Sequence, residues 1–136
     1  MANFLHQTLQ RLEKRLQSLI EGSAARLFPT YDFRSDLSQR LVDAMQTEIC
    51  LASDGTLIAP NLFTIFMPEQ QAQIFQNQTE LLDQLSDCLY QACHDAQVRF
   101  ISPPVLKVVS DPEPDSAQVQ VLAQFSLPQD EETSTL

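Results

Sequence analysis

The stretch TLIAPNLFTIFMPEQ, residues 56–70, decides the fold, because it holds two apolar runs around Pro60-Asn61 and ends in a proline that can open a helix. Thr56 to Ala59 and Leu62 to Met67 are typical of strands, and Pro60-Asn61 is typical of a turn. We therefore predict a β-hairpin here. Asp54-Gly55 predicts a further turn just before it.

Helical patterns lie on both sides of this hairpin. A helix is predicted from Asp36 to Ile49, with Ser35 as its N-cap. Pro68 begins a short helix to about Phe75, and a longer helix follows from about Thr79 to Gln97.

Two further strands follow the helices. Val105 to Ser110 is predicted as the third strand, and residues 111–116 as a polar loop. From Ala117 to Phe125 apolar and polar residues alternate, which predicts a strand with one buried face.

The N-terminal helix has its own pattern, in which apolar residues recur every three or four positions. This stripe is formed by Leu5, Leu9, Leu12, Leu16 and Leu19, followed by Ser23, and Gly22 is expected to interrupt the helix. Arg11, Lys14 and Arg15 fall on the opposite, charged side. The stripe favours a helix packed on its own domain, but it also fits a coiled coil, so a homodimer is an alternative.

The element order is therefore α-α-β-β-α-α-β-β. It predicts an α+β domain with helices on one face of a mainly antiparallel four-stranded sheet, over residues 1–127. Residues 128–136, PQDEETSTL, lack hydrophobic periodicity and are predicted to be an acidic Ser/Thr tail or linker.

Composition limits the function. The net charge is −10, and residues 41–136 hold only two of the eight basic side chains, so most of the chain would repel phosphate. The chain has only two glycines, Gly22 and Gly55, and they lie far apart in the sequence, which excludes a glycine-rich phosphate loop. No apolar run reaches the ~20 residues of a membrane span, and we expect a cytoplasmic protein.

Catalytic and metal-binding patterns are weak. Cys93, His94 and Asp95 are adjacent and would diverge around a helix. The cysteines Cys50, Cys88 and Cys93 form no CxxC pair, so a zinc site is not expected. We expect neither an enzyme nor a bound cofactor.

Four blocks of the chain resemble a known family, the domain of unknown function that precedes forkhead-associated (FHA) domains in bacterial signalling proteins of the FhaA type. The blocks are RLEKRLQSLIEGSAARLF (11–28), LSQRLVDAMQTEI (37–49), IAPNLFTIFMPEQ (58–70) and LLDQLSDCLYQACHDAQVRFISPPVLKVVSDPE (81–113).

The resemblance implies a non-catalytic scaffold module that binds a protein partner. Such a partner would be a Ser/Thr kinase or a membrane protein of cell-wall synthesis or division. The candidate contacts are Arg11, Lys14 and Arg15 on the first helix, with Pro60 and Asn61 on the hairpin turn.

Thr133, which follows three acidic residues and precedes Leu136 by three, is similar to threonines that FHA domains bind once phosphorylated. The alternative function is RNA binding, because the helix–strand order is similar to that of KH modules. The chain lacks their GxxG loop, so nucleic acid is a disfavoured partner.

Overall fold

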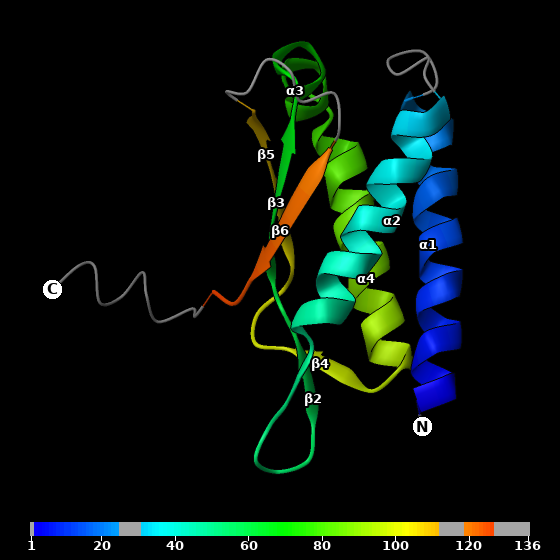
Figure 1. The fold of residues 1–136 in the computed structure, drawn as a ribbon, viewed down its shortest axis with the longest axis vertical. Helices are drawn as coiled ribbons and strands as arrows, with labels where there is room; N and C mark the ends of the chain where they lie inside the picture. The colour runs from blue at the N-terminus through cyan, green and yellow to red at the C-terminus, as the bar shows by residue number, and fades with distance from the viewer. Residues whose placement is uncertain (1, 25–30, 112–118, 127–136) are drawn as a thin grey trace, which may run out of the picture.

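A computed structural model describes residues 2–24, 31–111 and 119–126 (Figure 1). Two long helices come first, α1 (Ala2–Ala24) and α2 (Tyr31–Glu48). Strands and two more helices follow, and the chain is an α+β protein, as predicted.

Two extended segments of the chain form the centre of the β-structure. The first contains β2 (Leu57–Ala59) and then β3 (Leu62–Met67), and the second contains β4 (Val98–Phe100) and then β5 (Val105–Ser110). The segments run parallel, so that β2 pairs with β4 and β3 with β5. The register changes between the two pairs of strands, because the interruption between β4 and β5 is longer than the one between β2 and β3. Leu57 lies opposite Val98, whereas Leu62 lies opposite Val105.

Each end of this parallel pair carries one antiparallel strand. The short β1 (Cys50–Leu51) pairs with β2, and β6 (Gln120–Gln124) pairs with β3. In the described residues there are thus two mixed three-stranded sheets, β1-β2-β4 and β5-β3-β6. The prediction of one mainly antiparallel four-stranded sheet was wrong. Helices α3 and α4 connect β3 to the second segment, and a crossover of this kind produces parallel pairs.

The predicted hairpin across Pro60-Asn61 was also wrong. Strands β2 and β3 belong to different sheets and do not pair, because the chain continues in one direction through Pro60 and Asn61. The hairpin lies one turn earlier: β1 and β2 are joined through Asp54-Gly55, and Gly55 has φ +90°. The turn predicted at Asp54-Gly55 is confirmed, whereas β1 and β4 were missed.

The later helices were predicted well. Helix α3 spans Glu69–Gln76 after Pro68, and α4 spans Thr79–Asp95. The predicted third strand has the bounds of β5, and the fourth contains β6. Residues 112–116 of the predicted polar loop lie outside the described residues.

The first two helices are longer than predicted. Helix α1 continues through Gly22 to Ala24, since one glycine within a helix costs only about 1 kcal/mol. Helix α2 begins at Tyr31, so Ser35 lies inside the helix and is not its N-cap. No proline or glycine lies between Tyr31 and Ser35 to prevent helix formation there.

The core lies between the helices and the strands, with α1, α2 and α4 on one side (Figure 1). Helix α1 packs against α2 and α4 through its apolar stripe. Leu9, Leu12, Leu16 and Ile20 are buried, and Phe63, Ile65 and Met67 of β3 contribute from the sheet. These residues of the stripe are therefore buried inside the domain, which agrees with a helix packed on its own domain.

Among the described residues, no helix combines the length and apolar character that crossing a membrane requires.

Candidate functional site

The three basic residues predicted on the first helix lie together on its outer side. Arg11, Lys14 and Arg15 are all exposed, while Leu12 and Leu16 between and beside them are buried. Burial of the stripe therefore orients the charged side of α1 outward. We call Arg11, Lys14 and Arg15 the basic α1 surface.

Two residues of this surface border a hollow between α1 and α4. Arg11 and Arg15 line it with Cys88, Ala92 and Asp95 of α4, and its volume is about 170 Å³. Burial raises the pKa of the Cys88 thiol, and the nearby charge of Arg15 lowers it by less. The hollow is therefore lined by two cationic side chains, one carboxylate and small apolar groups, and it lies where α1 and α4 meet.

Asn61 lies in a different environment, since only 2% of it is exposed. Its Nδ2 donates hydrogen bonds to Ser102 Oγ (2.6 Å) and to the carbonyl oxygen of Ser126 (2.8 Å). Its Oδ1 accepts one from the Ser126 N–H (2.7 Å). Its backbone N–H donates to the Gln124 carbonyl (3.0 Å), and its own carbonyl accepts from the Val105 N–H (2.9 Å).

These bonds connect the start of β3 to the start of β5 and to the end of β6. Pro60 is also buried. The two residues were predicted as contacts because a hairpin turn can vary in sequence without breaking the core. The structure has no hairpin at this point, and Asn61 instead holds three chain segments together.

The third kind of predicted site, the phosphoacceptor Thr133, lies outside the described residues, together with the rest of the acidic tail.

The adjacent Cys93, His94 and Asp95 diverge, as helix geometry requires. Cys93 is buried with its Sγ 3.6 Å from Met45 Sδ, and burial raises its pKa to about 12. His94 is exposed and stacks on Tyr90, with ring centroids 6.4 Å apart. Within the described part of the chain, no group of three His, Cys, Asp or Glu side chains could hold a metal ion.

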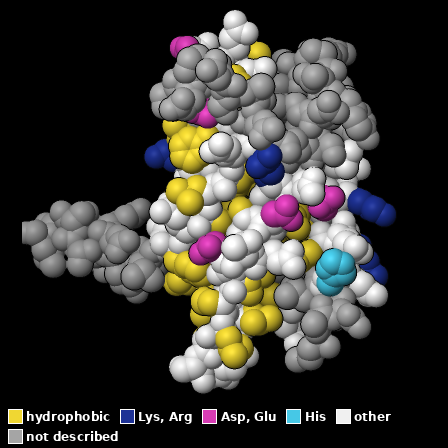
Figure 2. Space-filling view, viewed as in Figure 1, with side chains coloured by type: hydrophobic (Ala, Val, Ile, Leu, Met, Phe, Trp, Pro, Cys, Tyr) yellow, Lys and Arg dark blue, Asp and Glu magenta, His cyan; other side chains and the backbone are white. Residues whose placement is uncertain are grey.

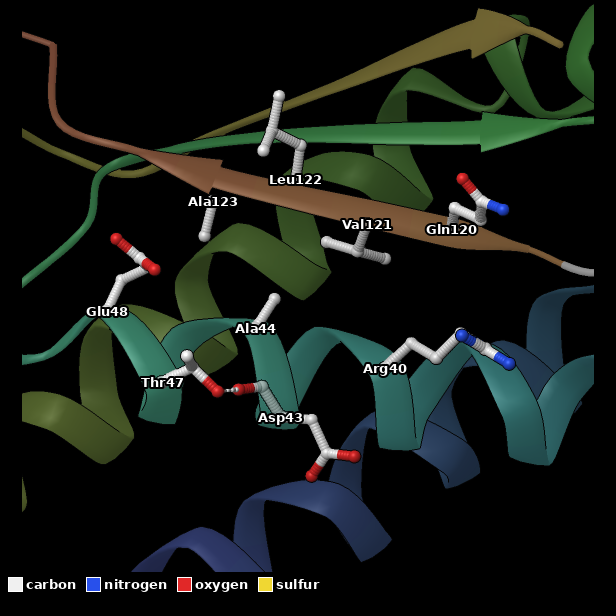
Figure 3. Close-up of a pocket in the computed structure, with 9 residues that line it drawn as sticks. All are labelled: Arg40, Asp43, Ala44, Thr47, Glu48, Gln120, Val121, Leu122 and Ala123. Atoms are coloured by element: carbon white, nitrogen blue, oxygen red, sulfur yellow. Dashed lines mark hydrogen bonds between the residues drawn. The ribbon is translucent and has the colours of Figure 1, made fainter.

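A larger groove, not expected from the sequence, separates α2 from β6. Its volume is about 460 Å³, and its strand side is formed by residues 120–123. Its helix side is formed by Arg40, Asp43, Ala44, Thr47 and Glu48. Figure 3 shows Ala44 on α2 and Val121 and Ala123 on β6 pointing into the space between the two elements. The available sequence signal was the absence of any charged residue from 119 to 125.

The comparisons with known proteins agree with the resemblance seen in the sequence. A family model described as the N-terminal domain of FhaA matches residues 9–122, which include every described element from within α1 to within β6. No curated protein and no solved structure shows significant similarity to the chain. Because the match spans most of its length, the chain belongs to the FhaA N-terminal domain family.

Proposed function

We propose that this domain is a non-catalytic protein-binding module of a bacterial FHA-type signalling protein, and that the basic α1 surface is its contact. Membership of the FhaA N-terminal domain family supports the association with FHA proteins. The observation that carries the proposal is the exposed cluster of Arg11, Lys14 and Arg15 on a chain of net charge −10.

The positive charge of this surface indicates which chemical groups the partner presents to it. Arginine and lysine side chains on one side of a helix attract carboxylates and phosphates, and they steer association before contact. The rest of the chain repels such groups, since residues 41–136 carry fourteen acidic side chains. An acidic segment of the partner would therefore approach along α1 and reach the hollow beside Asp95.

The proposed partner is a Ser/Thr kinase or a membrane protein that acts in cell-wall synthesis or division, and it meets the domain in the cytoplasm. Thr133 is the proposed phosphoacceptor in this pathway. Phosphorylation would add a charge of about −1.5 to −2 to a tail that is already acidic, and an arginine-rich reader would recognise that charge. Phosphopeptide mapping of the protein from growing cells tests this assignment.

The binding surface is tested by a charge reversal with a matched control. The double variant Arg11→Glu, Lys14→Glu changes the net charge by −4, as does the control Arg99→Glu, Lys107→Glu at exposed positions of β4 and β5. Arg15 is left intact, because its charge lies near the buried Cys88 thiol and lowers the pKa of that thiol. Each protein is used to capture partners from a lysate, which are quantified by mass spectrometry.

We expect proteins held by the wild-type domain to fall at least fivefold with the first variant and to stay within twofold with the control. Equal capture by both variants would contradict the basic α1 surface. RNA in the captured material, with retention that falls steeply with salt, would contradict a protein-binding function and support the KH-like alternative.

A further inference from the structure

The edge of the β5-β3-β6 sheet at β6 has an unusual composition. Strand β6 pairs with β3 on one side, and no other strand among the described residues pairs with its second side. Exposed edge strands usually carry charges or proline, which prevent another strand from adding to them. Residues 119–125, VQVLAQF, contain neither, although the chain contains 18 acidic and 8 basic residues.

Apolar surface is available beside this edge. Leu122 is 47% exposed and Phe125 is 38% exposed. Figure 2, in which β6 and α2 face the viewer, shows hydrophobic surface next to acidic side chains on this side of the molecule. An added strand would find apolar cross-strand neighbours here, and such pairs stabilise a sheet.

The groove between α2 and β6 gives this edge a second wall. Small side chains, Ala44, Val121 and Ala123, leave the space open, and Glu48 lies at one end of it (Figure 3). A strand edge that runs beside a helix can hold an extended peptide, because the backbone hydrogen-bonds to the strand while alternate side chains enter the groove.

We propose that an extended segment of a partner protein binds along β6 as an additional strand, in the groove between β6 and α2. The five residues of β6 rise about 3.4 Å each, so they would pair with a segment of about five residues. Its alternate residues that face Ala44 and Ala123 are apolar and small or medium in size. This surface is distinct from the basic α1 surface, so the inference goes beyond the proposed function.

Charge favours a basic segment as the occupant. Asp43, Glu48 and Arg40 are the charged residues that line the groove, and the strand itself is neutral. The Asp43 carboxylate points away from β6, whereas Glu48 lies at one end of the groove (Figure 3). A lysine or arginine of the segment beside Glu48 would be attracted to it. A second copy of this chain would bring a further net charge of −10 to the same edge, and repulsion between the two molecules opposes that association.

A phage-displayed library of random heptapeptides, selected on the 136-residue chain, supplies the probe. The enriched sequence is synthesised with a fluorescent label, and its Kd is measured by anisotropy. We expect enrichment of peptides that alternate apolar residues and contain lysine or arginine. Their binding should shift the NMR amide signals of residues 119–124 and 43–48.

Two substitutions on α2 provide the matched test. Thr47→Lys places a cation in the groove, whereas Gln46→Lys places the same charge on an exposed neighbouring residue that does not line it. We expect Thr47→Lys to raise the Kd at least fivefold and Gln46→Lys to change it less than twofold. Circular dichroism melting of both variants checks that they remain folded.

Three results would overturn the proposal. The first is a selection without enrichment, and the second is a peptide whose Kd responds equally to both substitutions. The third is a change of the β6 amide signals with protein concentration in the absence of peptide, together with sedimentation that shows a dimer. That result would make a second copy the occupant of the edge.

Discussion

Two short segments on either side of β2 have similar turn-forming residues and opposite roles. Asp54-Gly55 forms an exposed turn that joins β1 to β2, and its hydrogen bonds stay within a few residues. Pro60-Asn61 is buried, and its bonds reach residues 41 and 65 positions away along the chain. The comparison teaches that residue type marks an interruption of a strand, whereas the surroundings decide whether the chain reverses there.

The largest effect is expected at the buried segment. Asn61→Ala removes three side-chain hydrogen bonds and leaves polar groups of Ser126 and Ser102 without this partner, which should lower the free energy of unfolding by about 2–4 kcal/mol. Chemical denaturation measures the change. Asn61→Asp, which keeps the size but removes the Nδ2 donor, should be at least as destabilising. A loss below about 1 kcal/mol would contradict the role of Asn61 as a connection between segments.

A smaller effect is expected at the exposed turn. A Cβ at Gly55 would meet no atom within 4 Å, so Gly55→Ala creates no clash, but φ +90° is strained for alanine. The expected loss of stability is about 1–2 kcal/mol. Gly55→Asn should lose less, because asparagine tolerates positive φ better than alanine does. Equal losses for alanine and asparagine would show that backbone conformation is not the cause.

Removing one bond of the buried segment separates the contributions around Asn61. Ser102→Ala deletes the Oγ that accepts from Asn61 Nδ2, while the two bonds with Ser126 stay possible. We expect a loss of about 1 kcal/mol in the same denaturation experiment. If Ser102→Ala lowered the free energy of unfolding as much as Asn61→Ala does, the bond to Ser102 alone, and not the whole set of Asn61 hydrogen bonds, would account for the stabilisation.

The smallest effect concerns the charge of Asp54. Hydrogen bonds from the Thr56 hydroxyl and N–H to the Asp54 carboxylate hold its pKa below the ordinary 3.8. A lowered pKa in the folded state means that this contribution to stability is present above pH 3.8 and is lost as the pH falls through the folded-state pKa. Thr56→Val should raise the pKa toward its ordinary value, as an NMR titration of Asp54 would show. An unchanged pKa would exclude the hydroxyl as the main cause.

The sequence pattern predicted the helices and most of the strands, because the formation of a helix or strand depends mainly on residues that are close together in the sequence. Pro68 places the start of α3 correctly, and the apolar run 105–110 has the bounds of β5. The apolar stripe of α1 correctly separates buried Leu12 and Leu16 from exposed Arg11 and Lys14. These features require only the repeat of a helix or a strand.

Pairing could not be predicted in the same way, because it joins distant residues. The parallel pairing of β3 with β5 depends on how α3 and α4 return the chain to the same sheet. Strand β1 has two residues, too few for a recognisable alternation. The three-residue β4 follows α4 closely, with no proline or glycine to mark the end of the helix. The burial of Asn61 depends on Ser102 and Ser126, so its own sequence neighbours gave no sign of it.

The central claim of the proposed function is that partner proteins meet the exposed side of α1 and not the buried Pro60-Asn61 segment or helix α3. A photo-reactive amino acid placed at Lys14 tests it most directly, with the same residue at the exposed Gln73 of α3 as the control. Irradiation of cells that make each protein, followed by mass spectrometry, should give a cross-linked partner from position 14 and none from position 73. A cross-linked partner from position 73, and none from position 14, would contradict the account.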